Sequence, residues 1–555
     1  MADAGPAELL VEGRIASLAG SEGPAWVEAV AIARGRVIVA GRLADVAALA
    51  GPATRRLRLA PDEVALPGLT DAHLHLVDAA LARAKVDLHD AATIGEAQTR
   101  LRTAAATALL AEPEAWIAGA GWDADRFGRW PTADDLEAAA PGRRVALWAH
   151  DHHALLVSHR ALAEAGIDDG RGDPDGGVIR RDERGRATGV LHETAARIVS
   201  DRIPPPAADA IEAALRPLVR ELVSLGLVAA HDPGGLSNQR GLEGPIEVYR
   251  RLAARGELGM RVHPCIRPEQ LGAAGDKGVR SGAPLGPDPL DRLRMGWLKT
   301  FADGTLGSRT AALLEPLDPV PGEPPPPNGG YGVWMVSPRA LRGQAARAAG
   351  LGIATQVHAI GDAAVRAALD ALAPTVGATP LMPRVEHVQL IADGDVPRFA
   401  ALGIAASVQP IHVRSDAAKA RRLWGPRAEV GAYALAALAA TGAVVAAGTD
   451  APVEPVDPWP GIACAVTRAA PSWPEGTPPF GTANALGLWR AIRASCVDPA
   501  ISAGETDRGR LVAGHRADLV VLPAAVVAEP VEVDGALWHA RPRLVLMDGE
   551  VVAGG

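Results

Sequence analysis

The sequence predicts an α/β fold, a (β/α)8 TIM barrel with a long insertion, together with a small β-sandwich formed by both ends of the chain. Two observations indicate the barrel: four segments repeat a helical stretch, a glycine and a short apolar run, and further apolar runs between them also end on polar residues. A third indicates the sandwich, because residues 9–62 and 509–555 both alternate short β-like runs with turns. We therefore expect a sandwich of residues 1–62 with 509–555, and a barrel of residues 63–508.

The predicted barrel strands are apolar runs that are too short for helices and rich in Val, Ile and Ala, as in buried parallel strands. Segments such as LVSLGLVAAHD, RFAALGIAASVQP and LAATGAVVAAGTD show the pattern. In a barrel of this kind the functional side chains lie at the carboxyl ends of the strands. The eight strands are expected to end near His73, His231, His263, Lys299, His358, His387, Gln409 and Asp450.

Two stretches do not fit a simple alternation of strand and helix. The gap between His75 and Leu227 is too long for one crossover, so an insertion is expected at about residues 80–210. Within it, the turn-rich residues 170–189 predict a β-hairpin. A proline-rich loop, residues 319–332, follows Lys299 on the expected catalytic side and is a candidate lid.

The composition excludes several classes of protein. The chain has 555 residues with 56 basic and 65 acidic side chains, and its net charge of −9 argues against nucleic acid and anionic membranes as partners. No apolar stretch reaches the ~20 residues of a membrane span, and the first residues lack the pattern of a signal peptide. Three widely spaced cysteines fit neither a disulfide framework nor a cysteine-rich zinc module. A cytoplasmic location is expected.

Six polar residues at predicted strand ends indicate a metal site. His73 and His75 are spaced i and i+2, which on a strand places both imidazoles on one face, where they can share an ion. Each residue alone has an ordinary structural explanation, such as a buried histidine bonded to a carbonyl or an aspartate that caps a helix. The barrel brings His73, His75, Lys299, His358, His387 and Asp450 to one rim, which favours one functional site over six separate structural roles.

The order of these residues and the wording around them resemble the amidohydrolase superfamily. The segments that carry the resemblance are PGLTDAHLHL, WLKTFADGTLGSRTA, QVHAIGDAAV, RVEHVQL, GTDAPVEPVDPW and GRLVAGHRADLVVL. They are closer to the YtcJ-like branch, which includes N-substituted formamide deformylases, and DHHALLVSHRALAEAGI is similar to the insertion of that branch. The resemblance covers nearly the whole chain.

The resemblance implies a ligand set. His73, His75 and Asp450 would hold one divalent ion, and His358 and His387 would hold a second, with one or two ions present. Lys299 would bridge them as a carbamate formed with carbon dioxide, because an ammonium has no lone pair and repels a cation. A neutral amine must form first, so Lys299 is expected to be buried. Imidazole and carboxylate ligands suit zinc best among abundant metals.

The expected activity is hydrolysis of a non-peptide carbon–nitrogen bond, in a linear amide or an N-substituted formamide. Metal coordination lowers the pKa of water toward about 7 and so supplies hydroxide, while Asp450 acts as general base and then general acid. A lactone, ester or cyclic amide hydrolase is an alternative, since one barrel site supports several chemistries. A catalytically silent regulator that binds a small molecule is an alternative of another class.

Four further residues are candidate substrate contacts. Trp122 and Trp334 would form apolar walls of the pocket, and Arg309 would orient a substrate oxygen. His152 either contacts substrate or makes a structural hydrogen bond. The expected partner is a small-molecule substrate, and a homodimer is the candidate assembly.

Overall fold

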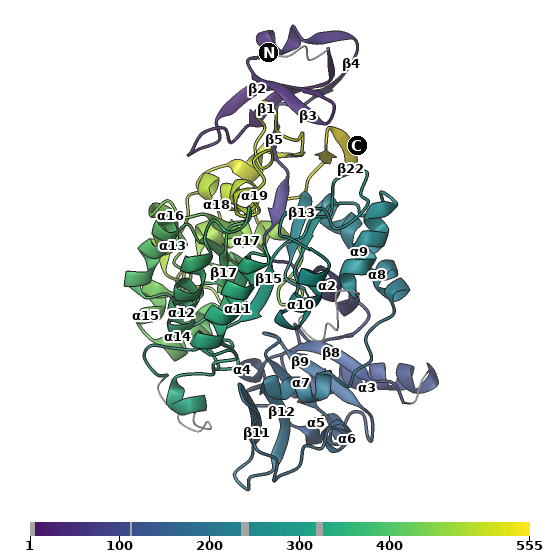
Figure 1. Ribbon diagram of the computed structural model, residues 1–555, viewed down its shortest axis with the longest axis vertical. Helices are drawn as coiled ribbons and strands as arrows, with labels where there is room; N and C mark the ends of the chain where they lie inside the picture. Colours follow the sequence, from purple (N-terminus) through teal and green to yellow (C-terminus); the bar gives the residue numbers. More distant parts are fainter. Residues whose placement is uncertain (1–5, 112–113, 235–243, 318–325, 555) are drawn as a thin grey trace.

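The computed structural model describes residues 6–111, 114–234, 244–317 and 326–554. Figure 1 shows a strand-rich region with both chain ends at the top, a central body of strands and helices, and the insertion at the bottom. Part of the candidate lid, residues 318–325, lies outside the described residues. The central body is the part that positions the site.

Parallel strands form two sheets at the centre of the molecule, one of three strands in the order β14-β13-β6 and one of five in the order β15-β16-β17-β18-β19. Their burial on both faces is what the runs of Val, Ile and Ala predict. The strands are β6 (Leu69–Asp71), β13 (Leu227–Asp232), β14 (Arg261–Pro264), β15 (Leu298–Phe301), β16 (Thr355–Ala359), β17 (Arg384–His387), β18 (Ala405–Val408) and β19 (Val445–Ala447).

The two parallel sheets touch at both pairs of edges. An isolated parallel bridge joins Ile266, just after β14, to Leu298 of β15. At the other seam the Ala72 backbone N–H, just after β6, donates to Ala447 O of β19 at 3.0 Å. The eight predicted parallel strands are therefore present in the predicted order. A few backbone hydrogen bonds at each seam join the sheets, but no strand ladder spans either seam among the described residues, so closure into one barrel stays a prediction.

Helices cover the outside of these strands and supply an apolar stripe to the core. In α8 (Ala208–Ser224), Ile211, Leu215 and Leu222 are buried at helical spacing and belong to the main apolar cluster. The other helices of the body are α2 (Leu76–Ala82), α9 (Pro245–Ala254), α10 (Leu271–Asp276), α11 (Pro338–Gly350), α12 (Asp362–Leu372), α13 (Val396–Leu402), α14 (Val413–Trp424), α15 (Arg427–Gly431), α16 (Leu435–Ala440), α17 (Pro458–Thr467), α18 (Leu488–Ala494) and α19 (Val497–Ser502).

The insertion is built around its own six-stranded sheet in the order β11-β12-β10-β9-β8-β7. Its elements are β7 (Val86–Asp87), α3 (Ile94–Ala111), β8 (Ile117–Trp122), α4 (Ala124–Phe127), α5 (Ala133–Glu137), β9 (Val145–Ala149), β10 (Ala154–Val157), α6 (His159–Glu164), β11 (Gly177–Arg181), β12 (Ala187–Glu193) and α7 (Thr194–Ser200). Strands β11 and β12 pair in antiparallel fashion, which confirms the predicted hairpin.

The two ends of the chain share one eight-stranded sheet, in the order β22-β21-β20-β5-β1-β2-β3 with β4 paired to β1. Its elements are β1 (Ala7–Ala16), β2 (Trp26–Ala33), β3 (Arg36–Gly41), α1 (Leu43–Ala47), β4 (Ala50–Arg58), β5 (Glu63–Pro67), β20 (Leu519–Pro523), β21 (Leu544–Met547) and β22 (Glu550–Gly554). Val520 of β20 pairs with Leu66 of β5, and one apolar cluster contains Val11, Val30 and Leu546. Because the strands form one sheet, the two-sheet sandwich stays a prediction.

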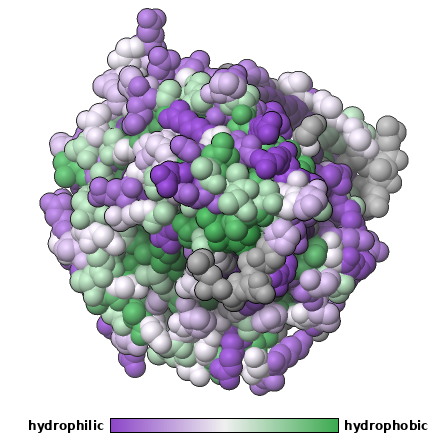
Figure 2. All heavy atoms as spheres, turned by 90° about the horizontal axis from the view of Figure 1, so that it is seen from above, coloured by the Kyte–Doolittle hydropathy of each residue, from purple (hydrophilic) through white to green (hydrophobic). Residues whose placement is uncertain are grey.

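The surface agrees with the ordinary polar balance of the sequence. Seen from above, hydrophilic residues spread over the whole outline, with smaller apolar areas between them (Figure 2). In the parts of the chain that the structure describes, none of the helices combines the length and the apolar character needed to cross a bilayer.

Candidate metal centre

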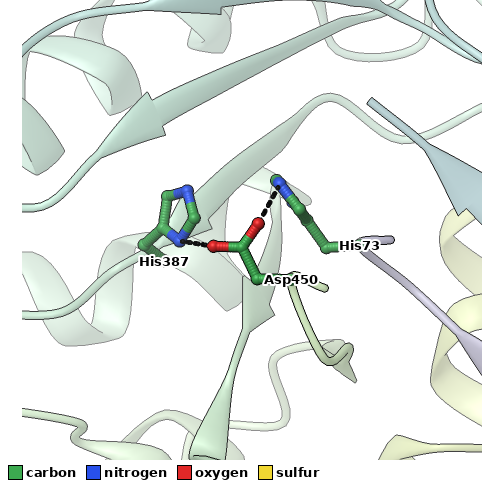
Figure 3. Close-up of side chains that lie close together, drawn as sticks. All are labelled: His73, His387 and Asp450. Carbon is green, nitrogen blue, oxygen red and sulfur yellow. Dashed lines mark ion pairs between the residues drawn. The ribbon is translucent and has the colours of Figure 1, made fainter. Parts of the chain in front are cut away.

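Three side chains from distant parts of the chain meet at the carboxyl ends of the central strands (Figure 3). His73 Nε2 lies 3.4 Å from Asp450 Oδ1, and His387 Nδ1 lies 3.9 Å from Asp450 Oδ2. One ligand atom from each of the three lies within 4.8 Å of the others. His387 and Asp450 have φ angles of +73° and +61°, and such strained backbone is typical of functional sites.

The other predicted ligands surround this trio. His75 Nε2 lies 3.4 Å from Asp450 Oδ1, and the ring centroid of His358 is 4.5 Å from that of His387. Lys299, His75, His358, His387 and Asp450 also line one cavity. The structure therefore brings the six predicted residues together, with His73 fully buried beside the cavity.

Lys299 differs from the prediction in its place on the strand. It is the second residue of β15 rather than the last, so its side chain starts deeper in the body. The residue is 1% exposed, as predicted, and its Nζ has no hydrogen-bond partner among the described residues. Burial lowers the pKa of Lys299 to about 8, although the negative charge of Glu386 raises it, so a neutral amine is accessible. The carbamate stays a prediction.

In three of the histidine rings, one nitrogen forms a hydrogen bond with an oxygen atom of the protein. His73 Nδ1 bonds to Glu386 Oε2, and His75 Nδ1 bonds to the carbonyl of Gly234. His358 Nε2 donates to the carbonyl of Gly304 at 3.1 Å. Each bond places the proton on the held nitrogen and the lone pair on the other, which is how metal-ligating imidazoles are oriented.

The atoms that would coordinate an ion lack other partners. Among the described residues, His73 Nε2, His387 Nδ1 and Asp450 Oδ1 are buried without a hydrogen bond. Leaving several buried polar atoms unpaired is costly, and such groups call for an ion or water. Imidazole lone pairs beside a carboxylate are the donors that a divalent transition metal prefers, so these residues fit such an ion.

A buried polar network lies behind His73. Glu386 Oε1 accepts from Arg384 Nε at 2.9 Å, and the Arg384 guanidinium also meets His231 Nδ1 at 2.9 Å and Gln356 Oε1 at 2.7 Å. Burial opposes ionisation of Glu386, but the charges of Arg384 and His73 outweigh it and lower the pKa of Glu386 to about 2. The carboxylate therefore remains an anion that fixes the orientation of His73.

We expect Glu386→Gln to weaken zinc binding roughly 10- to 100-fold, because an amide holds the His73 proton less firmly than a carboxylate does. Competition with a chromogenic chelator measures the affinity. Glu429→Gln is the matched control, since Glu429 also pairs with an arginine, Arg421, at 2.6 Å but outside the site. A folded Glu386→Gln protein with the native affinity for zinc would contradict the role.

The hydrogen bonds between the ends of β6 and β19 position two predicted ligands, His73 and Asp450. Asp71 accepts from the Thr449 hydroxyl at 2.6 Å, from the Thr449 N–H at 3.0 Å and from the His73 N–H at 3.0 Å. A Cβ on Gly448 would lie 2.4 Å from His73 N, so this close approach requires glycine. The Asp450 N–H completes the seam by donating to His73 O at 2.7 Å.

The sequence analysis missed a histidine close to Asp450. His412 follows β18, and its Nε2 lies 3.5 Å from Asp450 Oδ2 with no hydrogen-bond partner among the described residues. The expected strand end was Gln409, and His412 lies three residues beyond it, in a short 3-10 turn, Pro410–His412. The signal was a histidine soon after a predicted strand, at a distance that sequence reasoning assigns to a loop.

The candidate substrate contacts divide into two groups. Trp122 and Arg309 line the catalytic cavity, a space of about 900 Å³ including its opening to solvent. Trp122 is fixed there because its Nε1 donates to Leu147 O at 2.7 Å. His152 borders two other hollows, one next to α2 and one that Lys299 and His153 also line, and Trp334 borders a further one, so neither residue lines the cavity itself. The cavity's apolar wall consists of Trp122, Trp130, Phe301, Leu306, Ile360 and Val453.

Parallel strands that carry histidines, a carboxylate and a buried lysine at one cavity form the kind of site that a metal-dependent hydrolase with an α/β fold requires. The sequence model of the amidohydrolase family matches residues 60–553, and the chain belongs to this family.

Relatives extend over most of the chain. It is 30% identical over 493 residues to the putative amidohydrolase YtcJ of Bacillus subtilis (88% of this chain, 89% of YtcJ). It is 26% identical over 521 residues to an N-substituted formamide deformylase of Arthrobacter pascens (89% of this chain, 90% of the deformylase). These matches confirm the predicted resemblance. An uncharacterized metal-dependent hydrolase of Pyrococcus horikoshii shares the fold, with a TM-score of 0.70 and 24% identity over 93% of this chain and 97% of that one.

Proposed function

We propose that the protein hydrolyses a non-peptide carbon–nitrogen bond, in a linear amide or an N-substituted formamide, with a divalent metal. The observation that carries the proposal is the set of unpartnered atoms, His73 Nε2, His387 Nδ1 and Asp450 Oδ1, within reach of one another beside a cavity. Membership of the amidohydrolase family supports hydrolysis. The formamide substrate is supported by the relative from Arthrobacter pascens, whose name states that activity.

The metal would be held as the resemblance to the amidohydrolase family implies. His73, His75 and Asp450 would bind one ion, His358 and His387 a second, and Lys299 as a carbamate would bridge them. A bound ion would supply water whose pKa is lowered toward about 7, and it would polarise a substrate carbonyl. Zinc is the metal that best suits imidazole and carboxylate ligands.

Asp450 moves the proton in this scheme. Burial opposes its ionisation, but the neighbouring His73, His75 and His387 outweigh burial and hold the pKa of Asp450 well below its usual range. The side chain is therefore ionised, and we assign to this carboxylate the transfer of a proton from the attacking water to the departing nitrogen. Trp122 excludes water from one wall, and Arg309 orients a substrate oxygen.

A metal-and-substrate assay tests the proposal. Protein purified without chelator is analysed for metals, stripped, reloaded with zinc, and screened against N-formyl amines, N-acyl amines, cyclic amides and lactones. We expect bound transition metal and zinc-restored hydrolysis of linear amides, with the metal-free protein as control. Turnover confined to lactones or esters would show that the substrate is an ester or lactone rather than an amide. A protein with no metal and no zinc-restored hydrolysis would instead fit a silent, ligand-binding regulator.

A further inference from the structure

The insertion sends a histidine into the catalytic cavity. His153 lies in the turn between β9 and β10, and it lines the same cavity as Lys299 and Asp450. Its ring stacks on that of His358, with centroids 4.9 Å apart and an angle of 29° between the planes. The compact ligand group contains His73, His387 and Asp450 but not His153. His153 thus reaches the reaction site without being part of that group.

A carboxylate orients this histidine. His153 Nδ1 lies 2.7 Å from Glu193 Oε2, at the end of β12, and the Glu193 side chain is 1% exposed. Among the described residues the ring makes no other hydrogen bond, so Nε2 is the nitrogen left to meet a bound molecule. The His153 side chain is 11% exposed, which fits an atom that faces a cavity rather than a packed core.

The loop that follows β15, residues 303–310, donates hydrogen bonds to two carboxylates of the insertion, those of Glu193 and Asp151. Glu193 Oε1 accepts from the Thr310 hydroxyl at 2.5 Å. Asp151 Oδ2 accepts from the Thr305 and Ser308 hydroxyls at 2.6 and 2.7 Å, while Asp151 Oδ1 accepts from the His153 N–H at 3.1 Å. These bonds fix both the backbone and the ring of His153 relative to the strands that carry the ligands.

The close approach of the loop depends on a glycine. A Cβ on Gly304 would lie 2.1 Å from Glu193 Oε1 and 2.0 Å from the Thr310 hydroxyl oxygen. The carbonyl of the same residue accepts from His358 Nε2. Gly304 therefore contacts a predicted metal ligand on one side and the Glu193 carboxylate on the other, which couples the insertion to the centre.

We propose that His153 is a substrate-binding residue, whose Nε2 forms a hydrogen bond with the amide group of the bound substrate, and that Glu193 is its positioning residue. This inference rests on the proposed amide hydrolysis. It assigns to the insertion a direct part in substrate recognition, in addition to covering the cavity. The apolar wall formed by Trp122, Trp130 and Phe301 would then hold the substituent of the amide.

Kinetics of zinc-loaded variants test this role on the best substrate of the panel. His153→Phe keeps a ring that can stack on His358 but removes the hydrogen bond, and we expect kcat/KM to fall roughly 10- to 100-fold. Zinc content is expected to stay at the native value, while the melting temperature should fall because Glu193 loses a buried hydrogen-bond partner. Glu193→Gln should lower kcat/KM less, and should add almost no loss to His153→Phe, because Glu193 acts through that ring.

The matched control is His159→Phe, since His159 of the same insertion also pairs with a carboxylate, Asp134, at 2.7 Å, but on the surface. If His153→Phe does not fold, kcat/KM is measured for His153→Gln instead. Unchanged kcat/KM in a folded, zinc-loaded His153 variant would overturn the inference, and so would a loss of zinc with the same turnover per bound zinc. Native protein without turnover on the whole panel would overturn the proposed function itself, a separate result.

Discussion

Replacing Lys299 with alanine is expected to remove most of the bound metal and to lower kcat by about 100-fold or more, because the proposed bridging carbamate would be lost. Metal analysis after gel filtration and assays with added zinc measure both effects. Short carboxylic acids such as acetate or propionate should partly restore metal and activity by filling the space that the side chain leaves. An active and fully metallated Lys299→Ala protein would refute the carbamate.

Two variants control this experiment. Lys299→Met fills the same space with apolar atoms, so carboxylic acids should not restore metal binding or activity. The metal-free variant should be no less stable than the native protein, because the substitution removes an unpaired buried polar group. Lys419→Ala removes another lysine at the cavity, one that pairs with Asp123 at 3.4 Å, and zinc content should not change. Loss of zinc from both alanine variants would indicate general disruption instead.

Asp450→Asn is expected to lower kcat roughly 100- to 10,000-fold, the usual contribution of a general acid–base residue, with a smaller effect on substrate binding. Asparagine has the same shape and tolerates the positive φ of this position, so the fold should persist. The assay is carried out at saturating zinc, because Asp450 is also a predicted ligand. Comparison of kcat with KM, or with the inhibition constant of an unreactive substrate analogue, separates chemistry from binding.

Asp291→Asn is a matched control for the backbone, since Asp291 also has a positive φ, +52°, but lies in surface ion pairs with Arg294 and Arg516. Its activity should equal that of the native protein. If Asp450→Asn retained the native kcat at full zinc occupancy, a different residue would have to move the proton, and His412, 3.5 Å from Asp450 Oδ2, would be the next to test.

Much of the central fold was predictable because buried parallel strands have a plain sequence pattern. All eight short apolar strands end within three residues of the predicted positions, and His387 is the last residue of β17. Lys299 is nevertheless the second residue of β15, which ends two residues later. Burial on both faces removes the polar alternation that would mark a strand's limits, so the existence of a strand is easier to predict than its end.

The candidate site was predictable where function depends on residue type, and less so where it depends on packing. Metal ligation requires histidine, aspartate or lysine, so those residues stand out at strand ends. Glu386 was missed because a carboxylate inside a strand has no distinctive pattern until its partner, His73, is known. His152 and His153 are neighbours in one HDHH segment, and only the turn between β9 and β10 determines that His153 faces the cavity while His152 faces another hollow.

The shared terminal sheet has a consequence for how the chain is made. Val520 pairs with Leu66, so β5 is synthesised long before the strand that covers its edge. At the usual ribosomal rate of roughly 5–20 residues per second, that wait lasts tens of seconds. During this time the apolar edge of β5 stays open to wrong partners, and β5 leads directly into β6 and His73. Folding around His73 is thus tied to β20, a strand that is synthesised long after β5.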